Sequence, residues 1–206
     1  MPRGHLITFE GIEGSGKTTQ IELLGRWLSE INIAYKSFRE PGSTIIGERI
    51  RDILLNSKDI EIEPIVELFL YLSARSALVT EKIKPALDDG IIFILDRFTD
   101  STIAYQGWGL GLNIDRVRDT CLLASQGISP DLTFLLDIKP EVGLSRLNKF
   151  DRIEERGIEF LKKVREGFRA IANDDRERIE MIDAEKSIEV IHNLIRQKIE
   201  KFIKTG

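Results

Sequence analysis

The feature that most constrains the fold is a glycine-rich loop near the N-terminus that matches the pattern G-x-x-x-x-G-K-[ST]. The loop reads Gly11-Ile12-Glu13-Gly14-Ser15-Gly16-Lys17-Thr18. An apolar run of strand length, Leu6–Phe9, precedes it, and Thr18–Ile31 has the apolar spacing of a helix. A strand, a glycine loop and a helix in this order direct backbone N–H groups and the positive end of a helix dipole at one point. The segment therefore predicts a binding site for the phosphates of a nucleoside triphosphate.

Each part of this loop has a separate expected role. The glycines let the backbone wrap closely around phosphate oxygens. The Lys17 ammonium would neutralise the β- and γ-phosphates, and the Thr18 hydroxyl would ligate Mg²⁺. The expected nucleotide-binding residues of the loop are Gly11, Ile12, Glu13, Gly14, Ser15, Gly16, Lys17, Thr18 and Thr19.

Strand-length apolar runs alternate with helical patterns along the chain. The expected strands are Leu6–Phe9, Ala34–Arg39, Ile91–Leu95, Leu132–Ile138 and Arg178–Ile182. The expected helices are Thr18–Ile31, Ile46–Asn56, Pro64–Leu87, Ser101–Gly107, Ile114–Ser125, Pro140–Leu147, Ile158–Asn173 and Ser187–Ile203. This alternation predicts an α/β fold with a parallel central sheet of about five strands and helices on both faces. At 206 residues without a linker or repeat, the chain is expected to form a single domain, residues 1–206.

Composition excludes several classes of partner. The net charge of −4 argues against a nucleic-acid partner, because nucleic-acid-binding domains usually carry an excess of basic residues. No apolar stretch reaches the length of a membrane span, so no membrane partner is expected. No signal peptide fits before the first strand, and Cys121 is the single cysteine, which favours the reducing cytoplasm. Cys121 lies in an apolar-periodic helix, and a buried structural thiol is expected there.

Ligands of parallel sheets bind where the strands end, so the residues that leave each strand are candidate site residues. Arg39-Glu40-Pro41-Gly42 leaves the second expected strand, and Asp96-Arg97-Phe98 leaves the third. A carboxylate such as Asp96 at this place can hold Mg²⁺ through a water molecule, and Arg97 beside it can bind phosphate with two N–H groups. A simple surface ion pair between the two side chains is the alternative.

Motifs along nearly the whole chain resemble those of the thymidylate kinase family, whose members transfer the γ-phosphoryl group of ATP to dTMP. They are the glycine loop with an acid at its third position, Arg39–Gly42, Glu67–Arg75, Asp96–Phe98, Ser101–Gly107, Asp151–Glu154 and Ile182–Ala184. The resemblance implies a P-loop NTPase fold, ATP and dTMP as substrates, Mg²⁺ as the metal ion, and a homodimer.

The resemblance also implies roles for residues around the phosphate and sugar of dTMP. Glu13 would contact the 3′-hydroxyl of the sugar. Arg39, Arg51 and Arg97 would hold the phosphate of dTMP, and Glu40 would lie near the magnesium and phosphate groups.

A second group of residues is implied to bind the thymine base. Tyr71 would stack on the ring, where relatives usually carry phenylalanine, and Arg75 would donate to a base carbonyl. The two residues are four positions apart on an expected helix, so they lie on one helical face. Ser101 and Thr102 would line the base pocket, and Gln106 would close over the base.

The remaining implied roles concern selectivity and a lid. Tyr105 would fill the space of a ribose 2′-hydroxyl, and Arg146 would pack on the adenine of ATP. Some relatives carry an arginine at the position of Gly14; those without it supply the charge from the lid, here residues 148–157, through Lys149 or Arg152. The alternative for this charged segment is a solvated helix face. The expected catalytic residues are thus Lys17, Asp96, Arg97, Lys149 and Arg152.

Two rival functions remain open. A deoxynucleoside kinase would phosphorylate a sugar hydroxyl and would need a carboxylate base, for which Glu40 is the candidate. The run Asn148-Lys149-Phe150-Asp151 matches the N-K-x-D motif by which GTP-dependent switch proteins recognise guanine. Such proteins also need D-x-x-G, and no aspartate in the chain has glycine three residues later. The switch protein is therefore disfavoured.

Overall fold

The protein is described by a computed structural model that covers residues 3–57, 60–147 and 151–205. Its centre is a five-stranded parallel sheet in the order β2-β3-β1-β4-β5. The strands are β1 (Leu6–Glu10), β2 (Tyr35–Arg39), β3 (Ile92–Asp96), β4 (Leu132–Asp137) and β5 (Ile179–Asp183). The strand number and the parallel pairing confirm the sheet that the sequence predicts.

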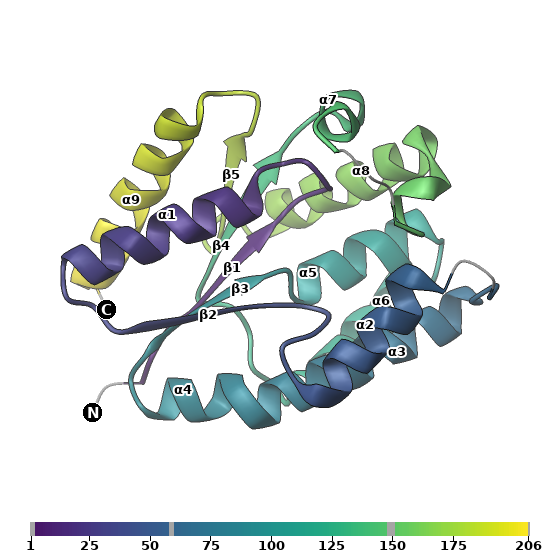
Figure 1. Ribbon diagram of the computed structural model, residues 1–206, viewed down its shortest axis with the longest axis horizontal. Coiled ribbons are helices and arrows are strands. Elements are labelled where there is room, and N and C mark those ends of the chain that lie inside the picture. The colour runs from purple at the N-terminus through teal and green to yellow at the C-terminus, as the bar shows by residue number, and fades with distance from the viewer. Residues whose placement is uncertain (1–2, 58–59, 148–150, 206) are drawn as a thin grey trace.

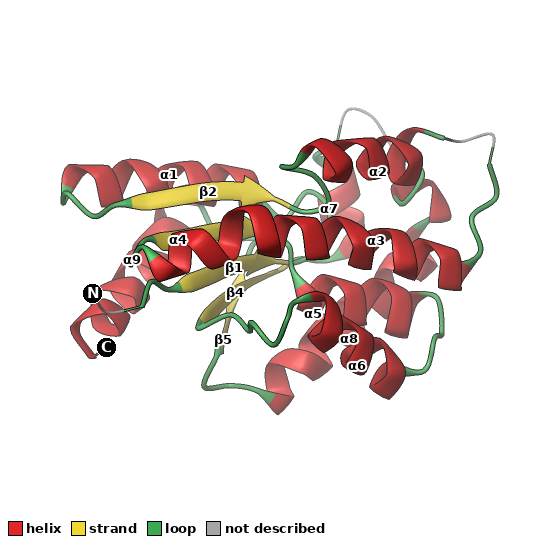
Figure 2. Ribbon diagram, turned by 90° about the horizontal axis from the view of Figure 1, so that it is seen from below, coloured by secondary structure: helices red, strands yellow, loops and turns green. Residues whose placement is uncertain are grey.

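Helices cover both faces of this sheet. They are α1 (Lys17–Glu30), α2 (Ile45–Asn56), α3 (Pro64–Leu78), α4 (Lys84–Asp88), α5 (Thr99–Thr102), α6 (Ile114–Ala124), α7 (Pro140–Ser145), α8 (Ile158–Asp174) and α9 (Ile188–Thr205). Helices α1 and α9 lie on one face and α4 lies on the other (Figures 1 and 2). Because both faces are covered, the central strands β1, β3 and β4 are nearly continuous apolar runs with buried side chains.

Two predicted helices differ from the structure in the same way. The predicted helix Pro64–Leu87 is divided into α3, a π-helical segment Val79–Ile83 and α4. Pro85 has no N–H group to donate to the carbonyl of the preceding turn, which accounts for the wider turn just before it. The predicted helix Ser101–Gly107 begins earlier, as α5, and continues as a π-helical segment, Ile103–Gly109. Wide turns of this kind are frequent at functional sites.

Several helices extend beyond the carboxyl ends of the strands. Figure 2 shows α2, the first half of α3, α5 and α6 past the tip of the β2 arrow. The loops that leave the strands therefore meet these helices at one edge of the sheet. In the described residues, no helix is both long and apolar enough to cross a lipid bilayer.

The described part of the expected lid is not a solvated helix face. Residues 151–157 form a turn and the short 3₁₀ helix Glu154–Arg156, in which Ile153 and Glu154 are buried. The first part of the lid, with Lys149 and most of the N-K-x-D run, lies outside the described residues. Cys121 is buried, as the sequence predicts.

Candidate active site

A cavity of about 710 Å³ opens at the carboxyl ends of the strands. One end is formed by the glycine loop and the first turn of α1, and the other by residues of β2, α2, α3 and the π-helical segment Ile103–Gly109. The cavity-lining residues among those expected from the sequence are Glu13, Gly14, Ser15, Gly16, Lys17, Thr18, Thr19, Arg39, Glu40, Arg51, Tyr71, Arg75, Asp96, Arg97, Ser101, Thr102, Tyr105, Gln106 and Arg146. Residues far apart in the sequence are thus brought to one site.

The glycine loop has the backbone conformation that its glycines permit. Gly11, Gly14 and Gly16 all have positive φ, which side chains rarely tolerate. A Cβ atom at Gly14 would also collide with the backbone of Gly143 at the carbonyl oxygen. The contact explains why this chain carries no larger residue at position 14.

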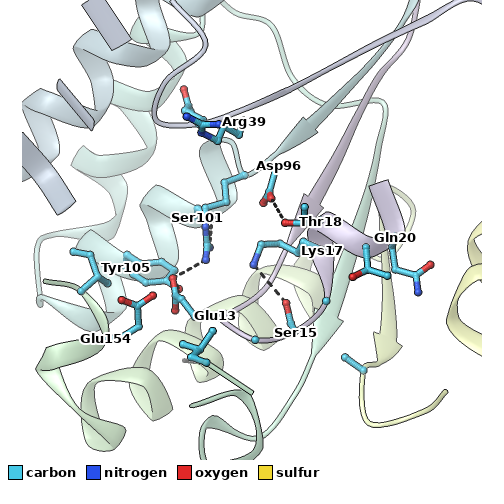
Figure 3. A pocket seen from close by; sticks show the side chains of 18 of the residues that line it. Glu13, Ser15, Lys17, Thr18, Gln20, Arg39, Asp96, Ser101, Tyr105 and Glu154 are labelled. Carbon is cyan, nitrogen blue, oxygen red and sulfur yellow. Dashed lines mark hydrogen bonds and ion pairs between the residues drawn. The ribbon is translucent and has the colours of Figure 1, made fainter. Parts of the chain in front are cut away.

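The Lys17 side chain folds back onto the glycine loop. Its ammonium donates to the carbonyl oxygens of Gly11 (3.0 Å) and Ile12 (3.2 Å), and Figure 3 shows its contact with Ser15. Burial and the nearby Arg97 lower the pKa of Lys17 to about 8, against the effect of neighbouring carboxylates. A bound polyphosphate would supply the negative charge that this buried cation lacks.

Thr18 and Asp96 meet at the mouth of the loop. The Thr18 hydroxyl donates to the carboxylate of Asp96 at 3.4 Å (Figure 3). A hydroxyl and a carboxylate are the hard oxygen ligands that Mg²⁺ uses when it is held mainly by phosphates and water. The described residues include no cluster of three or more His, Cys, Asp or Glu side chains that could hold a metal ion.

Arg97 lies between the glycine loop and the opposite wall of the cavity. Its guanidinium donates to the Gly11 carbonyl (2.9 Å), to the Ser101 hydroxyl (3.1 Å) and to the Glu13 carboxylate (2.7 Å). The Tyr105 hydroxyl donates to the same Glu13 carboxylate at 2.7 Å. Arg97 therefore does not form an isolated surface ion pair with Asp96, which was the alternative.

The backbone of Arg97 is held in the left-handed region, at φ 70°. The Arg97 N–H donates to the carbonyl of Phe9, and the next N–H, of Phe98, donates to the Glu10 carboxylate at 2.7 Å. Such a conformation persists only where its surroundings hold it.

Glu10 is a site residue that the sequence analysis missed. It is the last residue of β1, it is buried, and it also accepts from the Ser101 hydroxyl at 2.5 Å. Burial and the charge of Asp100 raise its pKa to about 7. A signal was present, since Glu10 leaves a buried strand just before the loop.

Glu40 and Arg75 form a buried ion pair at the back of the cavity. The Arg75 guanidinium donates to both Glu40 oxygens, at 2.7 Å for the shortest contact, and to the Thr102 hydroxyl at 2.8 Å. Burial raises the pKa of Glu40, although the charge and hydrogen bonds of Arg75 oppose the change. Arg75 Nη1 contacts only the weak acceptor Cys121 Sγ, at 3.4 Å, among the described residues, and Arg75 lines the cavity.

Two further arginines line the cavity near the start of α2. Arg39 pairs with Glu48 at 3.0 Å, and Arg51 donates to the Pro41 carbonyl at 3.0 Å. Burial and the positive charge of Arg39 lower the pKa of Arg51. Two neighbouring cations at a cavity wall favour an anionic ligand.

Arg146 lies at the other end of the cavity. It donates to the carbonyl of Gly14 (3.1 Å) and to that of Ala184 (3.3 Å), so it joins the glycine loop to the loop after β5. Ala184 and Ile188 also line the cavity there. This end of the cavity, next to the glycine loop, is therefore lined by both polar and apolar side chains.

Arg152 is not among the residues that line the cavity. Its guanidinium donates to the Leu54 carbonyl at 2.7 Å and forms an ion pair with Glu67 of α3, which also pairs with Arg156. To reach the phosphates of a nucleotide, as the sequence predicts, Arg152 would have to leave these partners. The ion pair between Glu67 and Arg156 could not be predicted, since nothing in a linear pattern places residues 67 and 156 together.

The fold and the site define a P-loop kinase, in which a phosphate-binding loop after the first strand faces a second, arginine-rich binding region. The family model described as thymidylate kinase matches residues 9–195. The thymidylate kinase of Carboxydothermus hydrogenoformans is 47% identical over 92% of this chain and 93% of its own, and that of Caldanaerobacter subterraneus is 42% identical over 98% of both. The crystal structure of thymidylate kinase from Ehrlichia chaffeensis superposes with a TM-score of 0.79 at 34% identity, over 97% of this chain and 99% of that one.

The chain belongs to the thymidylate kinase family. It is therefore an ATP-dependent nucleoside monophosphate kinase, as the sequence motifs predict. The comparisons favour neither of the rival functions, the deoxynucleoside kinase and the GTP-dependent switch protein.

Proposed function

We propose that this chain transfers the γ-phosphoryl group of ATP to dTMP, giving dTDP and ADP, within the single cavity described above. The observation that carries the proposal is the continuity of the cavity from the glycine loop to the wall formed by Arg39, Arg51 and Tyr71. A triphosphate at Lys17 and a monophosphate at the arginines would meet near Arg97, which contacts the loop and the opposite wall.

A monophosphate acceptor needs no general base. The second pKa of a phosphate monoester is about 6, so the attacking group is already mostly a dianion at neutral pH. The barrier is then the repulsion between two anions, which positioning and cations reduce. Glu40, the base that a sugar kinase would need, is buried and paired with Arg75.

Mg²⁺ would be held by the Thr18 hydroxyl and, through water, by Asp96, together with oxygens of the nucleotide. It would neutralise charge on the β- and γ-phosphates. Glu13, which accepts from Arg97 and Tyr105, would contact the sugar of dTMP, and Tyr71 would stack on its base. Arg75, Thr102 and Gln106 would bind the edge of the base.

A panel of acceptors tests this assignment. We expect Mg-ATP and dTMP to give dTDP, scored by chromatography of the products, with dUMP and dGMP as weaker acceptors. Faster phosphorylation of another monophosphate than of dTMP would contradict the acceptor assignment.

Tyr105 is expected to exclude ribonucleotides by its bulk. Its side chain is buried and fixed by the hydrogen bond to Glu13 and by Arg97 over its ring, at 5.1 Å from the centroid. Tyr105→Ala should lower the preference for dTMP over ribothymidine monophosphate by up to about a hundredfold, the usual limit for exclusion by shape. Tyr105→Phe, the matched control, removes the hydroxyl and keeps the ring, so it should retain the preference. The ratio of kcat/KM values measures the effect, and an unchanged preference in Tyr105→Ala would refute the role.

A homodimer through the outer face of α3 and α6 is also proposed. The two helices pack side by side. They expose the large apolar side chains Ile65, Val66, Phe69, Leu122 and Leu123, of which Leu123 is 80% exposed. Exposed apolar side chains gathered on two neighbouring helices are typical of a protein interface. Sedimentation should give twice the chain mass of 23.5 kDa, and Leu123→Glu should halve it; a monomeric wild type would contradict the proposal.

The buried, unpaired Cys121 fits the proposed cytoplasmic location.

A further inference from the structure

Glu67 of α3 is a charged side chain to which the family motifs assign no substrate contact. It is completely buried, with 0% of its surface exposed. Three side chains donate to its carboxylate: Gln106 at 3.0 Å, Arg156 at 2.6 Å, and Arg152. A buried carboxylate is costly unless its oxygens are paired in this way.

The charge of Glu67 fixes which end of the Gln106 amide it contacts. Burial opposes ionisation of Glu67, but the hydrogen bonds from Arg156 and Arg152 outweigh it and lower the pKa of Glu67. An ionised carboxylate can only accept hydrogen bonds. The contact between Glu67 and Gln106 must therefore be made by the amide nitrogen of Gln106, which settles an orientation that atomic positions alone leave open.

This orientation decides what Gln106 offers to a ligand. Gln106 lies on the π-helical segment Ile103–Gly109 and lines the cavity. The hydrogen bonds among the described residues include none to its side-chain oxygen, so that oxygen is free to accept from a ligand. Tyr71, the proposed platform for the base, follows Glu67 by one turn of α3 and lines the same cavity.

The pyrimidine bases differ at the group that would meet this acceptor. Thymine and uracil carry an N–H donor at ring position 3, whereas cytosine carries an unprotonated nitrogen there, which is itself an acceptor. Two acceptors that face each other in a buried site lose a hydrogen bond and leave a polar group unpaired.

We propose that Glu67 is a positioning residue for recognition of the acceptor base. By binding the amide nitrogen of Gln106, it presents the amide oxygen to the ring N–H of a thymine-type base and disfavours cytosine. The inference rests on the proposed function of the cavity as the dTMP site and deepens it. Glu67 thus selects the base without touching it.

The test compares dTMP and dCMP as acceptors in the wild type and in Glu67→Gln. A neutral glutamine at position 67 can donate as well as accept, so the Gln106 amide is free to turn over. We expect the ratio of kcat/KM for dTMP to that for dCMP to fall at least about tenfold. The change should lie in KM for the monophosphates, with KM for ATP nearly constant. Arg156→Gln is the matched control, because it removes a cation from the same carboxylate and leaves the contact with Gln106, so its ratio should stay within about twofold of the wild type.

Two further variants separate positioning from general damage. Glu67→Asp keeps the charge beside the arginines and withdraws the acceptor from Gln106, so it should also lower the ratio, even if Glu67→Gln fails to fold. In a Gln106→Leu background, Glu67→Gln should change the ratio no further. Two results would overturn the inference, provided that the wild type phosphorylates dTMP. One is an unchanged ratio of kcat/KM for dTMP to that for dCMP in folded Glu67→Asp. The other is a change in this ratio caused by Glu67→Gln that is as large in the Gln106→Leu background as in the wild type. A wild type that does not phosphorylate dTMP would instead reject the proposed function, and the inference with it.

Discussion

Replacing Arg97 by alanine is expected to lower kcat about a thousandfold while the protein stays folded. Arg97 donates to the glycine loop at Gly11, to Glu13 and to Ser101, so it is the one described cation that contacts the loop and the opposite wall of the cavity. Phosphoryl transfer depends on cations placed where charge develops, and removal of such an arginine costs about 10³ or more in rate.

Steady-state kinetics with Mg-ATP and dTMP measure the effect, and thermal unfolding reports on the fold. Arg97→Lys keeps the positive charge but lacks the paired N–H donors of a guanidinium. We therefore expect its kcat to lie between those of the wild type and Arg97→Ala. Arg118→Ala is the matched control, because Arg118 pairs at 3.6 Å with Asp174 on the surface and lines no part of the cavity. A kcat within tenfold of the wild type in Arg97→Ala would contradict the role.

The second large effect is expected in the lid. We expect the double variant Lys149→Ala, Arg152→Ala to lower kcat at least about a hundredfold, with little change in the dissociation constant of ATP, because the interaction forms in the transition state. A side chain at Gly14 would collide with Gly143, so a cation in addition to Lys17 would have to come from outside the loop. Arg152 can reach the phosphates only by leaving Glu67 and the carbonyl of Leu54.

The single variants identify which of the two residues acts. If Arg152 is the residue, Arg152→Ala alone should account for most of the loss; if Lys149 is, Arg152→Ala should change kcat only slightly. Measurement of single-turnover rates with saturating dTMP separates the chemical step from product release. Near-normal kcat in the double variant would contradict the role of the lid. Lys17, Mg²⁺ and Arg97 would then be the groups that stabilise the negative charge of the transferring phosphoryl group.

Local patterns predict most of the fold and the half of the site that binds triphosphate. The strand, the glycine loop and α1 are contiguous, so their residues meet wherever the rest of the chain lies. Asp96 and Arg97 could be placed because the carboxyl ends of parallel strands share one edge. The π-helical turns were missed, since the apolar spacing of a π-helical and an α-helical turn differs too little to be read over a few residues.

The polar contacts that orient the site could not be predicted from single positions. Glu67 lies in a helix with the Tyr71 and Arg75 motif, yet its partners are Gln106 and Arg156, which only tertiary packing brings to it. Arg75 likewise donates to Glu40, Thr102 and the Phe98 carbonyl, and these partners are also brought to it only by tertiary packing. Sequence motifs identify such residues as a group, and the structure shows which neighbours each of them contacts.

The central claim is that the acceptor is a monophosphate rather than a nucleoside, and one measurement tests it most directly. The protein is incubated with Mg-ATP and either dTMP or thymidine, and the products are identified by ³¹P NMR. We expect dTDP and ADP in equal amounts from dTMP and no dTMP from thymidine, because the cavity offers arginines for an acceptor phosphate, and Glu40, the candidate base, is paired with Arg75. Phosphorylation of thymidine without conversion of dTMP would contradict it.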